Sequence, residues 1–148
     1  NSYLDQVDAI CVTTNMSTKR NGKAVMGAGN AKDAKSRFYG IDEDLGVLIR
    51  DKGNVVFPIR NEKFSIGKNY KEIPIVAFPV KFEWWEQANA QLIEDSIRKL
   101  LILTNERGWK KVILPRPGVG SGKLSWDEKI KPILDQYLDE RFLVIKRR

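Results

Sequence analysis

The sequence predicts an α/β fold with a mixed, mostly parallel central sheet that helices cover on both faces. Short apolar runs rich in β-branched residues alternate with longer segments of helical periodicity. Such alternation is typical of parallel strands joined by crossover helices. Two of the runs are each followed by a glycine-containing loop and then by a helix. Ligands in such folds bind at the carboxyl ends of the strands, so we expect both loops on one rim of the sheet.

The later glycine loop is the most informative stretch of the chain. It follows a predicted strand at residues 112–114 and carries Gly118, Gly120 and Gly122 at alternate positions. Ser125 then provides a cap for a predicted helix. Glycines let backbone N–H groups approach a ligand closely, and a helix N-terminus favours an anion. The loop therefore suits a phosphate group.

Two named phosphate-binding motifs do not fit this loop. A Walker A loop ending at Lys123 would need glycine in place of Pro117 and Ser or Thr in place of Leu124. The Rossmann pattern needs a different glycine spacing and opens its fold, whereas this loop lies near the end of the chain. A plain surface turn is the alternative reading. The earlier glycine loop of the same kind favours a phosphate site.

Composition narrows the possible chemistry. The 148 residues suffice for one domain, 1–148, with a real core, and no run is apolar enough to span a membrane. Cys11 is the only cysteine, which excludes an internal disulfide and fits a reducing compartment, so we expect a cytoplasmic protein. Histidine is absent, which removes Ser-His-Asp triads, Cys-His pairs and most zinc sites. The net charge of +7 favours an anionic partner, although solubility alone would also explain it.

The remaining elements follow in order. We expect strands at residues 7–14, 55–59, 73–80 and 142–145. Helices are expected after the first glycine loop (24–29), at 42–52 with Asp42 as cap and Gly53 as end, and at 88–106. The polar stretches 15–23 and 62–71 should be an exposed loop and a loop or hairpin tip. No repeat or linker interrupts this order.

With these segments placed, the chain resembles a macrodomain, the three-layer α/β/α module that binds ADP-ribose, over nearly its whole length. Residues 8–10 followed by Asn15 resemble the first strand of that family and its ribose-side asparagine. Residues 25–29 with Ala31 resemble its first phosphate loop, and 118–126 resemble its second. The resemblance implies one ADP-ribose as ligand. It implies contacts from Asn1, Ile10, Asn15, Met26, Gly27, Ala28, Gly118, Val119, Gly120, Ser121 and Gly122.

One branch of the family is the most similar. It holds the terminal ADP-ribose protein glycohydrolases and the antitoxins that strip ADP-ribose from DNA. In that branch a catalytic lysine follows the strand between the two loops, and Lys81 stands in its place after Phe78-Pro79-Val80. The protein-directed members have an aspartate where this chain has Gly122, whereas the DNA-directed antitoxins have glycine. The resemblance thus leans towards a DNA acceptor.

Two further departures concern the first strand and the sheet edge. Val12 replaces an asparagine that is usual in the branch, so Asn15 must serve the distal ribose alone. The first edge strand of the family is short or missing here, because Asn1 already matches the motif that follows it. We therefore expect residues 142–145 at an exposed sheet edge, protected mainly by Lys146, Arg147 and Arg148.

Lys81 could act chemically only if its amine is neutral at working pH. That requires a pKa lowered by desolvation or by a nearby cation, and the apolar run before Lys81 and the aromatic residues after it favour desolvation. An exposed strand-end lysine, or a protonated clamp on phosphate or ribose, is the alternative. Trp84 and Trp85 could stack on a base or cover the distal ribose, or pack in the core. Asp33 and Asp127 read as surface charges rather than catalytic acids.

Three function classes remain open at this stage. The first is an ADP-ribosyl glycohydrolase that acts through Lys81 on a modified macromolecule, with DNA favoured over protein. The second is an ADP-ribose-1''-phosphate phosphatase, and the third is a non-catalytic ADP-ribose reader. We expect a monomer that needs no metal and no cofactor and does not associate with membranes.

Overall fold

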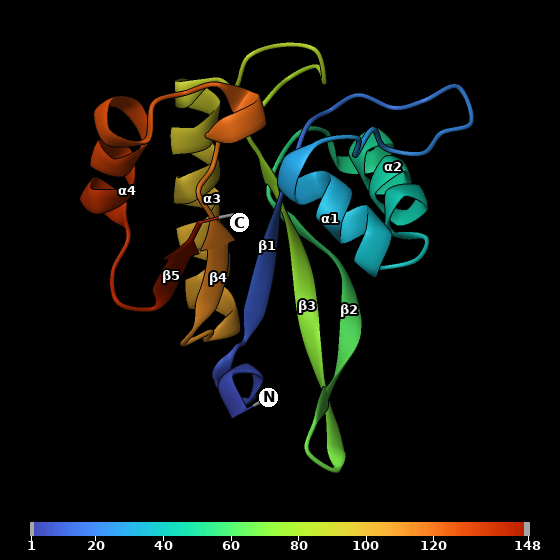
Figure 1. Cartoon of the computed structure of the whole chain (residues 1–148), viewed down its shortest axis with the longest axis vertical. Helices are drawn as coiled ribbons and strands as arrows, with labels where there is room; N and C mark the ends of the chain where they lie inside the picture. Colours follow the sequence, from blue (N-terminus) through green and yellow to red (C-terminus); the bar gives the residue numbers. More distant parts are fainter. Residues whose placement is uncertain (1, 147–148) are drawn as a thin grey trace.

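The computed structural model of the chain describes residues 2–146, and its centre is a five-stranded sheet (Figure 1). The strands are β1 (Ala9–Thr14), β2 (Phe57–Ile66), β3 (Asn69–Pro79), β4 (Val112–Pro115) and β5 (Phe142–Ile145), and their order is β2-β3-β1-β4-β5. The pairs β3–β1, β1–β4 and β4–β5 are parallel, and the pair β2–β3 is antiparallel. The prediction of a mixed, mostly parallel sheet is confirmed.

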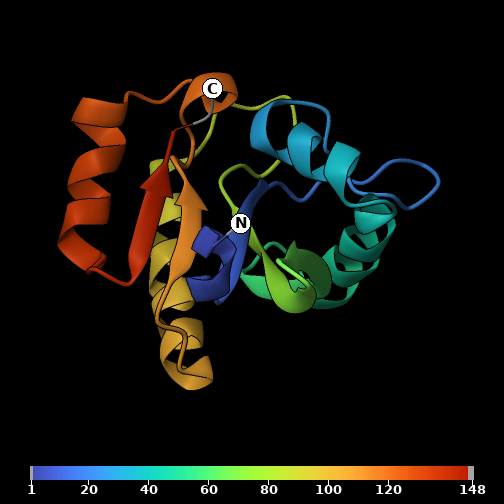
Figure 2. The ribbon, with the colours of Figure 1, turned by 60° about the horizontal axis from the view of Figure 1, so that its bottom comes forward.

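Helices form one layer on each side of the sheet (Figure 1, Figure 2). Helices α1 (Gly29–Arg37) and α2 (Ile41–Lys52) pack on one face, and α3 (Ala90–Arg107) and α4 (Lys131–Tyr137) pack on the other. A π-helical turn, Trp126–Ile130, precedes α4, and Ser125 caps it as expected, accepting a hydrogen bond from Glu128 N–H. The α/β/α layering follows from these contacts.

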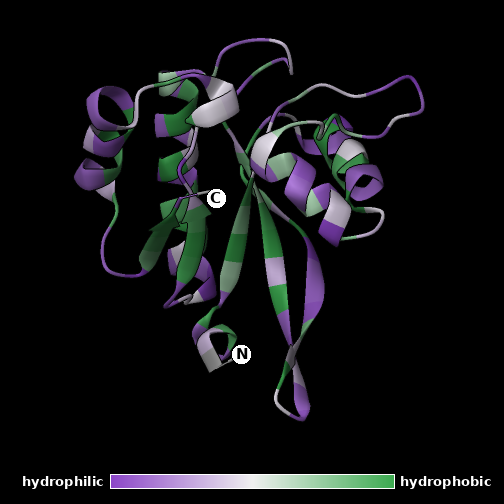
Figure 3. Ribbon diagram, in the orientation of Figure 1, coloured by the Kyte–Doolittle hydropathy of each residue, from purple (hydrophilic) through white to green (hydrophobic). Residues whose placement is uncertain are grey.

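Both faces of the central strands are apolar, as the hydropathy colouring shows (Figure 3). In β1, Val12 packs towards α1 and α2, while Cys11 packs towards α3 and α4. In β3, Ala77 and Phe78 divide between the two cores in the same way. Because successive side chains of a strand point to opposite faces, a strand between two helical layers must be apolar throughout. None of the described helices is long and apolar enough to cross a membrane.

One local expectation was wrong. Asp42 is not the cap of α2, which begins one residue earlier, at Ile41, after Gly40 with φ +79°. For the stretch 62–71, the sequence left a loop or a hairpin tip open, and the structure has the hairpin, because β2 and β3 continue to a tight turn at Gly67. The buried ring of Phe64 packs edge-on against Phe38, with 6.1 Å between the ring centroids, and anchors the outer half of β2, where residues 60–65 are otherwise polar.

Strand β5 lies at one edge of the described sheet, as expected, and pairs with β4. Residues Ser2–Gln6 form a 3-10 turn before β1, and no strand precedes β1 in the range 2–146. Among the described residues no strand pairs with the outer edge of β5, and its Leu143 and Ile145 side chains are exposed. Lys146 follows directly, whereas Arg147 and Arg148, the other predicted protectors, lie outside the described residues.

Candidate functional site

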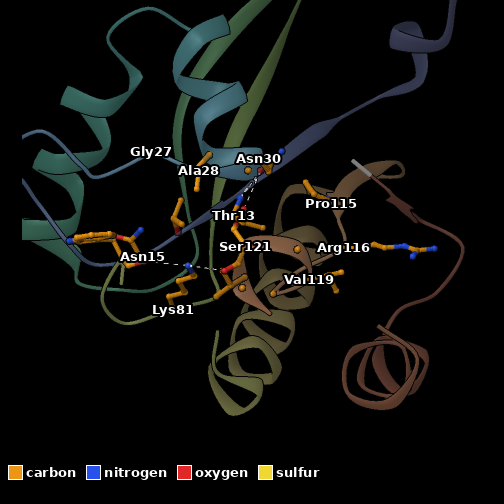
Figure 4. A pocket seen from close by; sticks show the side chains of 18 of the residues that line it. Thr13, Asn15, Gly27, Ala28, Asn30, Lys81, Pro115, Arg116, Val119 and Ser121 are labelled. Carbon is orange, nitrogen blue, oxygen red and sulfur yellow. Dashed lines mark hydrogen bonds between the residues drawn. The ribbon is translucent and has the colours of Figure 1, made fainter. Parts of the chain in front are cut away.

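A cavity of about 640 Å³ lies at the carboxyl ends of β1, β3 and β4 (Figure 4). Its size is within the usual range for sites that hold a small molecule or cofactor. One wall is the start of α1, the opposite wall is the loop after β4, and Lys81 stands beyond the end of β3. The lining residues are Thr13, Thr14, Asn15, Val25, Gly27, Ala28, Gly29, Asn30, Ala31, Val80, Lys81, Trp84, Pro115, Arg116, Gly118, Val119, Gly120, Ser121, Gly122 and Lys146.

The cavity exists because two neighbouring strands separate. Strand β1 pairs with β3 over five positions, from Ile10 to Thr14, but with β4 over only two, Ala9 and Ile10. Strand β4 pairs with β5 along its whole length instead. The gap that opens between β1 and β4 lies where the chain order of the sheet reverses, the place where open α/β sheets bind ligands.

Asn30 takes over a hydrogen bond at the opening. Thr13 lies past the part of β1 that pairs with β4, and its N–H donates to Asn30 Oδ1 at 2.9 Å. The Thr13 hydroxyl donates to the same oxygen at 3.4 Å. A part-buried backbone N–H without a hydrogen-bond partner costs free energy. The Asn30 side chain therefore supplies the acceptor that a neighbouring strand would otherwise provide. This contact also attaches the start of α1 to the end of β1.

The N-terminus of α1 faces the cavity without a side-chain cap. Ala28 occupies the N-cap position and cannot accept a hydrogen bond from the first-turn N–H groups through its side chain. Gly29 has φ +55°, and a Cβ atom there would lie 3.0 Å from Ser121 Oγ on the opposite loop. The two loops therefore approach each other closely at this point. An uncapped helix end of this kind attracts an anion.

The glycines of the second loop (118–122) let it pack closely against α3 and against Ala88, just before α3. Gly118 has φ +76°, and a Cβ atom there would lie 2.7 Å from Ile93 Cδ1. A Cβ atom at Gly122 would lie 2.9 Å from Ala88 Cβ. Gly120 also has φ +76°, but a Cβ atom there would meet nothing within 4 Å. Gly118 and Gly122 thus serve packing, while Gly120 shapes the backbone beside open space.

Lys81 stands where the segment after β3 meets the second loop. Its Nζ donates hydrogen bonds to the Ser121 carbonyl at 3.4 Å and to the Trp84 carbonyl at 3.3 Å. Partial burial lowers the pKa of the Lys81 amine below its ordinary value of 10.5, and the positive charge of Lys123 lowers it further. At any given pH, a larger fraction of this amine is neutral than in an ordinary lysine.

Lys123 has an unusual backbone. It has φ +67°, the one positive φ recorded for a non-glycine residue in the described part of the chain, and its N–H donates to the Gly120 carbonyl. A lysine in this conformation costs roughly 1 kcal/mol or more. The turn places a second positive charge near Lys81.

The segment 81–89 connects the two loops. Its Phe82 carbonyl accepts a hydrogen bond from Met16 N–H, and its Trp84 N–H donates to Ser17 Oγ. Met16 and Ser17 lie in the long loop between β1 and α1. At its other end, Ala88 N–H donates to the Gly122 carbonyl. Lys81 is therefore held between two segments that are far from it in sequence.

Most of the residues expected to bind ligand line this cavity. They are Asn15, Gly27, Ala28, Lys81, Gly118, Val119, Gly120, Ser121 and Gly122. Met26 does not line it, because its side chain is 2 % exposed and packs in the core between the sheet and α1. Ile10 does not line it either and contacts the same core. Asn1 lies outside the described residues.

The Asn15 side chain has a structural duty that the sequence did not indicate. Its Nδ2 donates to the Val25 carbonyl at 3.2 Å, and its Oδ1 accepts from Ser17 N–H at 2.8 Å. The Asn15 amide thereby joins the two ends of the loop between β1 and α1. Its edge still borders the cavity (Figure 4).

Several lining residues were not foreseen. Asn30 could have been suspected, because asparagine is a typical residue of helix starts. Arg116 and Lys146 are brought to the cavity by the pairing of β4 with β5, where Arg116 N–H donates to the Ile145 carbonyl. The Arg116 guanidinium lies 4.1 Å from the centre of the Trp126 ring, a cation–π contact. No sequence signal indicates that the pairing of β4 with β5 brings Arg116 and Lys146 to the cavity.

Carboxylates are missing from the cavity wall. Among the lining residues given above, no Asp or Glu occurs. Within residues 2–146, no three Cys, Asp or Glu side chains are placed to hold a metal ion. The wall combines an uncapped helix start, glycine-containing loops and the cationic side chains of Lys81, Arg116 and Lys146, a set suited to an anionic ligand.

Comparison with solved structures finds the same fold in known proteins. The macrodomain of Mycobacterium tuberculosis DarG is similar over 97 % of this chain and 90 % of its own, with TM-score 0.69 and 21 % identity. The macrodomain of Thermus aquaticus DarG is similar over 100 % and 94 %, with TM-score 0.69 and 24 % identity. Thermosipho africanus DarTG, solved in complex with ADP-ribose, is similar over 99 % of this chain but 40 % of its own, with TM-score 0.72 and 21 % identity. No protein-family model and no curated protein sequence matches the chain.

The contact between Thr13 and Asn30 predicts a specific loss of stability. Replacing Asn30 with Ala leaves the Thr13 N–H without its acceptor, which should lower the free energy of unfolding by about 1–2 kcal/mol. Asn30→Asp is the matched control. It keeps an oxygen acceptor and adds a charge favoured near a helix N-terminus, so it should lose less. Urea unfolding of the three proteins measures this, and an Ala variant as stable as the wild type would contradict the assigned role.

Proposed function

We propose that this chain, whose fold is that of a macrodomain, binds one ADP-ribose in the cavity and removes ADP-ribose from a modified macromolecule. DNA is the favoured acceptor. The observation that carries the proposal is that an uncapped helix start and a glycine loop face each other across the cavity, with a lysine of lowered pKa beside them. Thermosipho africanus DarTG, which shares the fold, was solved with ADP-ribose.

The geometry favours one orientation of the ligand. The diphosphate fits between the start of α1 and residues 118–122, where both walls offer backbone N–H groups. Asn15 and Lys81 lie together on one side of the cavity, and Pro115 and Arg116 lie on the other (Figure 4). The distal ribose then reaches Lys81, and the adenine takes the end beside Pro115 and Lys146. Ile10, expected on the adenine side, does not line the cavity and is partly buried against the core.

Lys81 would act on the anomeric carbon of the distal ribose. As a nucleophile, its neutral amine forms a bond to that carbon while the bond from the carbon to the acceptor breaks. The electron pair leaves with the acceptor, which takes up a proton, and water then releases ADP-ribose from the lysine. As a base, Lys81 would instead take the proton of an attacking water. Both routes need the neutral amine, which desolvation and the charge of Lys123 favour.

One observation favours a non-catalytic reader as the second candidate. The two carbonyls that accept hydrogen bonds from Lys81 Nζ suit a protonated ammonium group as well as an amine. A protonated Lys81 would bind phosphate or ribose without chemistry. The phosphatase has less support, because the cavity wall described above carries no Asp or Glu and the chain has no histidine.

Gly120 tests the placement of the diphosphate. Replacing it with Val forces a β-branched residue into φ +76° and adds atoms beside the cavity, so ADP-ribose affinity should fall at least about tenfold. Gly67→Val is the matched control. Gly67 likewise has a positive φ, +58°, and open space around it, but it lies at the β2–β3 turn, away from the cavity. Calorimetry should show wild-type affinity for the control. Unchanged affinity in Gly120→Val would place the diphosphate elsewhere.

Lys81 tests the chemistry. Lys81→Ala should keep ADP-ribose affinity within a few-fold and lose turnover on ADP-ribosylated DNA by on the order of 100-fold or more, because the group that attacks or takes the proton is gone. Lys81→Arg separates the two roles of the side chain. Arginine is always charged, so it should bind ADP-ribose but not restore turnover.

Three outcomes of that assay are informative. An Ala variant at the wild-type rate would remove Lys81 from the mechanism. Full activity in Lys81→Arg would make the residue an electrostatic clamp. A wild-type protein that binds ADP-ribose but releases it from neither DNA nor protein would be the reader.

A further inference from the structure

The most exposed aromatic side chains near the cavity lie directly after Lys81. Phe82, Trp84 and Trp85 are 44 %, 56 % and 67 % exposed, and Met16 beside them is 42 % exposed. We call these four residues the aromatic ledge. Met16 belongs to it because its N–H donates to the Phe82 carbonyl at 2.8 Å. Large apolar side chains gathered in the open are a mark of a binding surface.

The backbone of the ledge is ordered by hydrogen bonds. Trp84 N–H donates to Ser17 Oγ at 2.9 Å, and the same hydroxyl donates to Glu83 Oε1 at 2.7 Å. Glu86 Oε1 accepts from Glu83 N–H at 2.8 Å. Both carboxylates of the segment are thereby engaged in the loop and are partly buried. The aromatic rings remain outside, on a preformed support.

Cations lie near residues of the ledge. Lys81 directly precedes Phe82 and lies close enough to Lys123 for the charge of Lys123 to lower its pKa, and Lys19 and Arg20 are exposed three and four residues after Met16. Within residues 2–146, none of these four cations forms an ion pair. Exposed aromatic side chains close to unpaired cations, with the carboxylates of Glu83 and Glu86 hydrogen-bonded and partly buried, suit stacked bases and a phosphate backbone. An acidic or neutral peptide has no comparable need for several flat rings.

Only one residue of the ledge lines the cavity proposed to hold ADP-ribose. Trp84 lines the cavity and can cover the distal ribose, but Trp85, Phe82 and Met16 do not line it. In the ligand orientation proposed above, the acceptor leaves from the distal ribose next to Lys81. These three side chains are exposed apolar surface in the segment that follows Lys81 and on its neighbour Met16, where the next atoms of the acceptor can lie.

We propose that the aromatic ledge stacks the bases that flank the modified nucleotide in a single-stranded nucleic acid, with Trp85 as its main contact. This rests on the proposed function, because it takes the acceptor to emerge at Lys81. A single strand is required, since paired bases would not expose their faces to the rings. Trp85 is a specificity residue in this scheme and takes no part in bond breaking.

The test compares a long and a short acceptor that share one linkage. The substrates are a single-stranded oligonucleotide carrying one ADP-ribosylated base, and the corresponding ADP-ribosylated nucleoside. Trp85→Ala should lower kcat/KM for the oligonucleotide about 5- to 160-fold, the usual effect of losing one stacked base, and leave kcat/KM for the nucleoside unchanged. Trp85→Phe should recover most of the loss. Tyr39→Ala, which removes an aromatic residue that is 97 % exposed elsewhere, is the control and should change neither value.

Other results would overturn the proposal. An equal loss on both substrates would show a structural role for Trp85, and no loss on either would show that the ledge does not contact the strand. The same Trp85 dependence on an ADP-ribosylated peptide would show that the ledge does not select nucleic acid.

Failure of the proposed function can be told apart from failure of the ledge. If the wild type binds ADP-ribose without turnover, the two substrates are compared by dissociation constant instead. The ledge then predicts that the oligonucleotide binds more tightly than the nucleoside in the wild type and in Tyr39→Ala, and that Trp85→Ala abolishes the difference. Equal affinities in the wild type would overturn the ledge even there.

Discussion

The separation of β1 from β4 is the constraint on which the site depends. The two strands pair at Ala9 and Ile10 and then part, and the cavity occupies the space between them. Parting leaves the Thr13 N–H to be satisfied, and Asn30 does so from the first turn of α1. One hydrogen bond therefore both compensates the open sheet and aims the N-terminus of a helix at the cavity.

The opposite wall depends on close backbone packing rather than on charge. Gly118 and Gly122 allow the second loop to lie against Ile93 and Ala88 at distances that a Cβ atom would prevent. Because Ala88 N–H also bonds the Gly122 carbonyl, this loop and the segment that carries Lys81 are positioned together. Partial burial lowers the pKa of the Lys81 amine, and the charge of Lys123, which the same arrangement brings near, lowers it further. The loop proposed to bind the ligand and the proposed catalytic group are thus held in place by the same contacts.

Sequence reasoning went furthest where local pattern determines structure. Strand–loop–helix order indicated the layers and the common rim, and Lys81 was placed by the strand it follows. Contacts with distant partners could not be foreseen. Phe64 anchors the outer half of β2 through contact with Phe38, and Arg116 reaches the cavity through the pairing of β4 with β5. Met26 sits between two glycine-loop residues in sequence, yet its long apolar side chain is buried in the core instead of lining the cavity.

A crystal structure of the protein with ADP-ribose bound would test the proposed site most directly. We expect diphosphate oxygens within hydrogen-bond distance of backbone N–H groups from both the start of α1 and residues 118–122. We also expect the anomeric carbon of the distal ribose roughly 3–3.5 Å from Lys81 Nζ, the separation of a reactive pair. A nucleotide bound in the reverse direction, with adenine beside Lys81, or one bound outside this cavity, would contradict the proposed site.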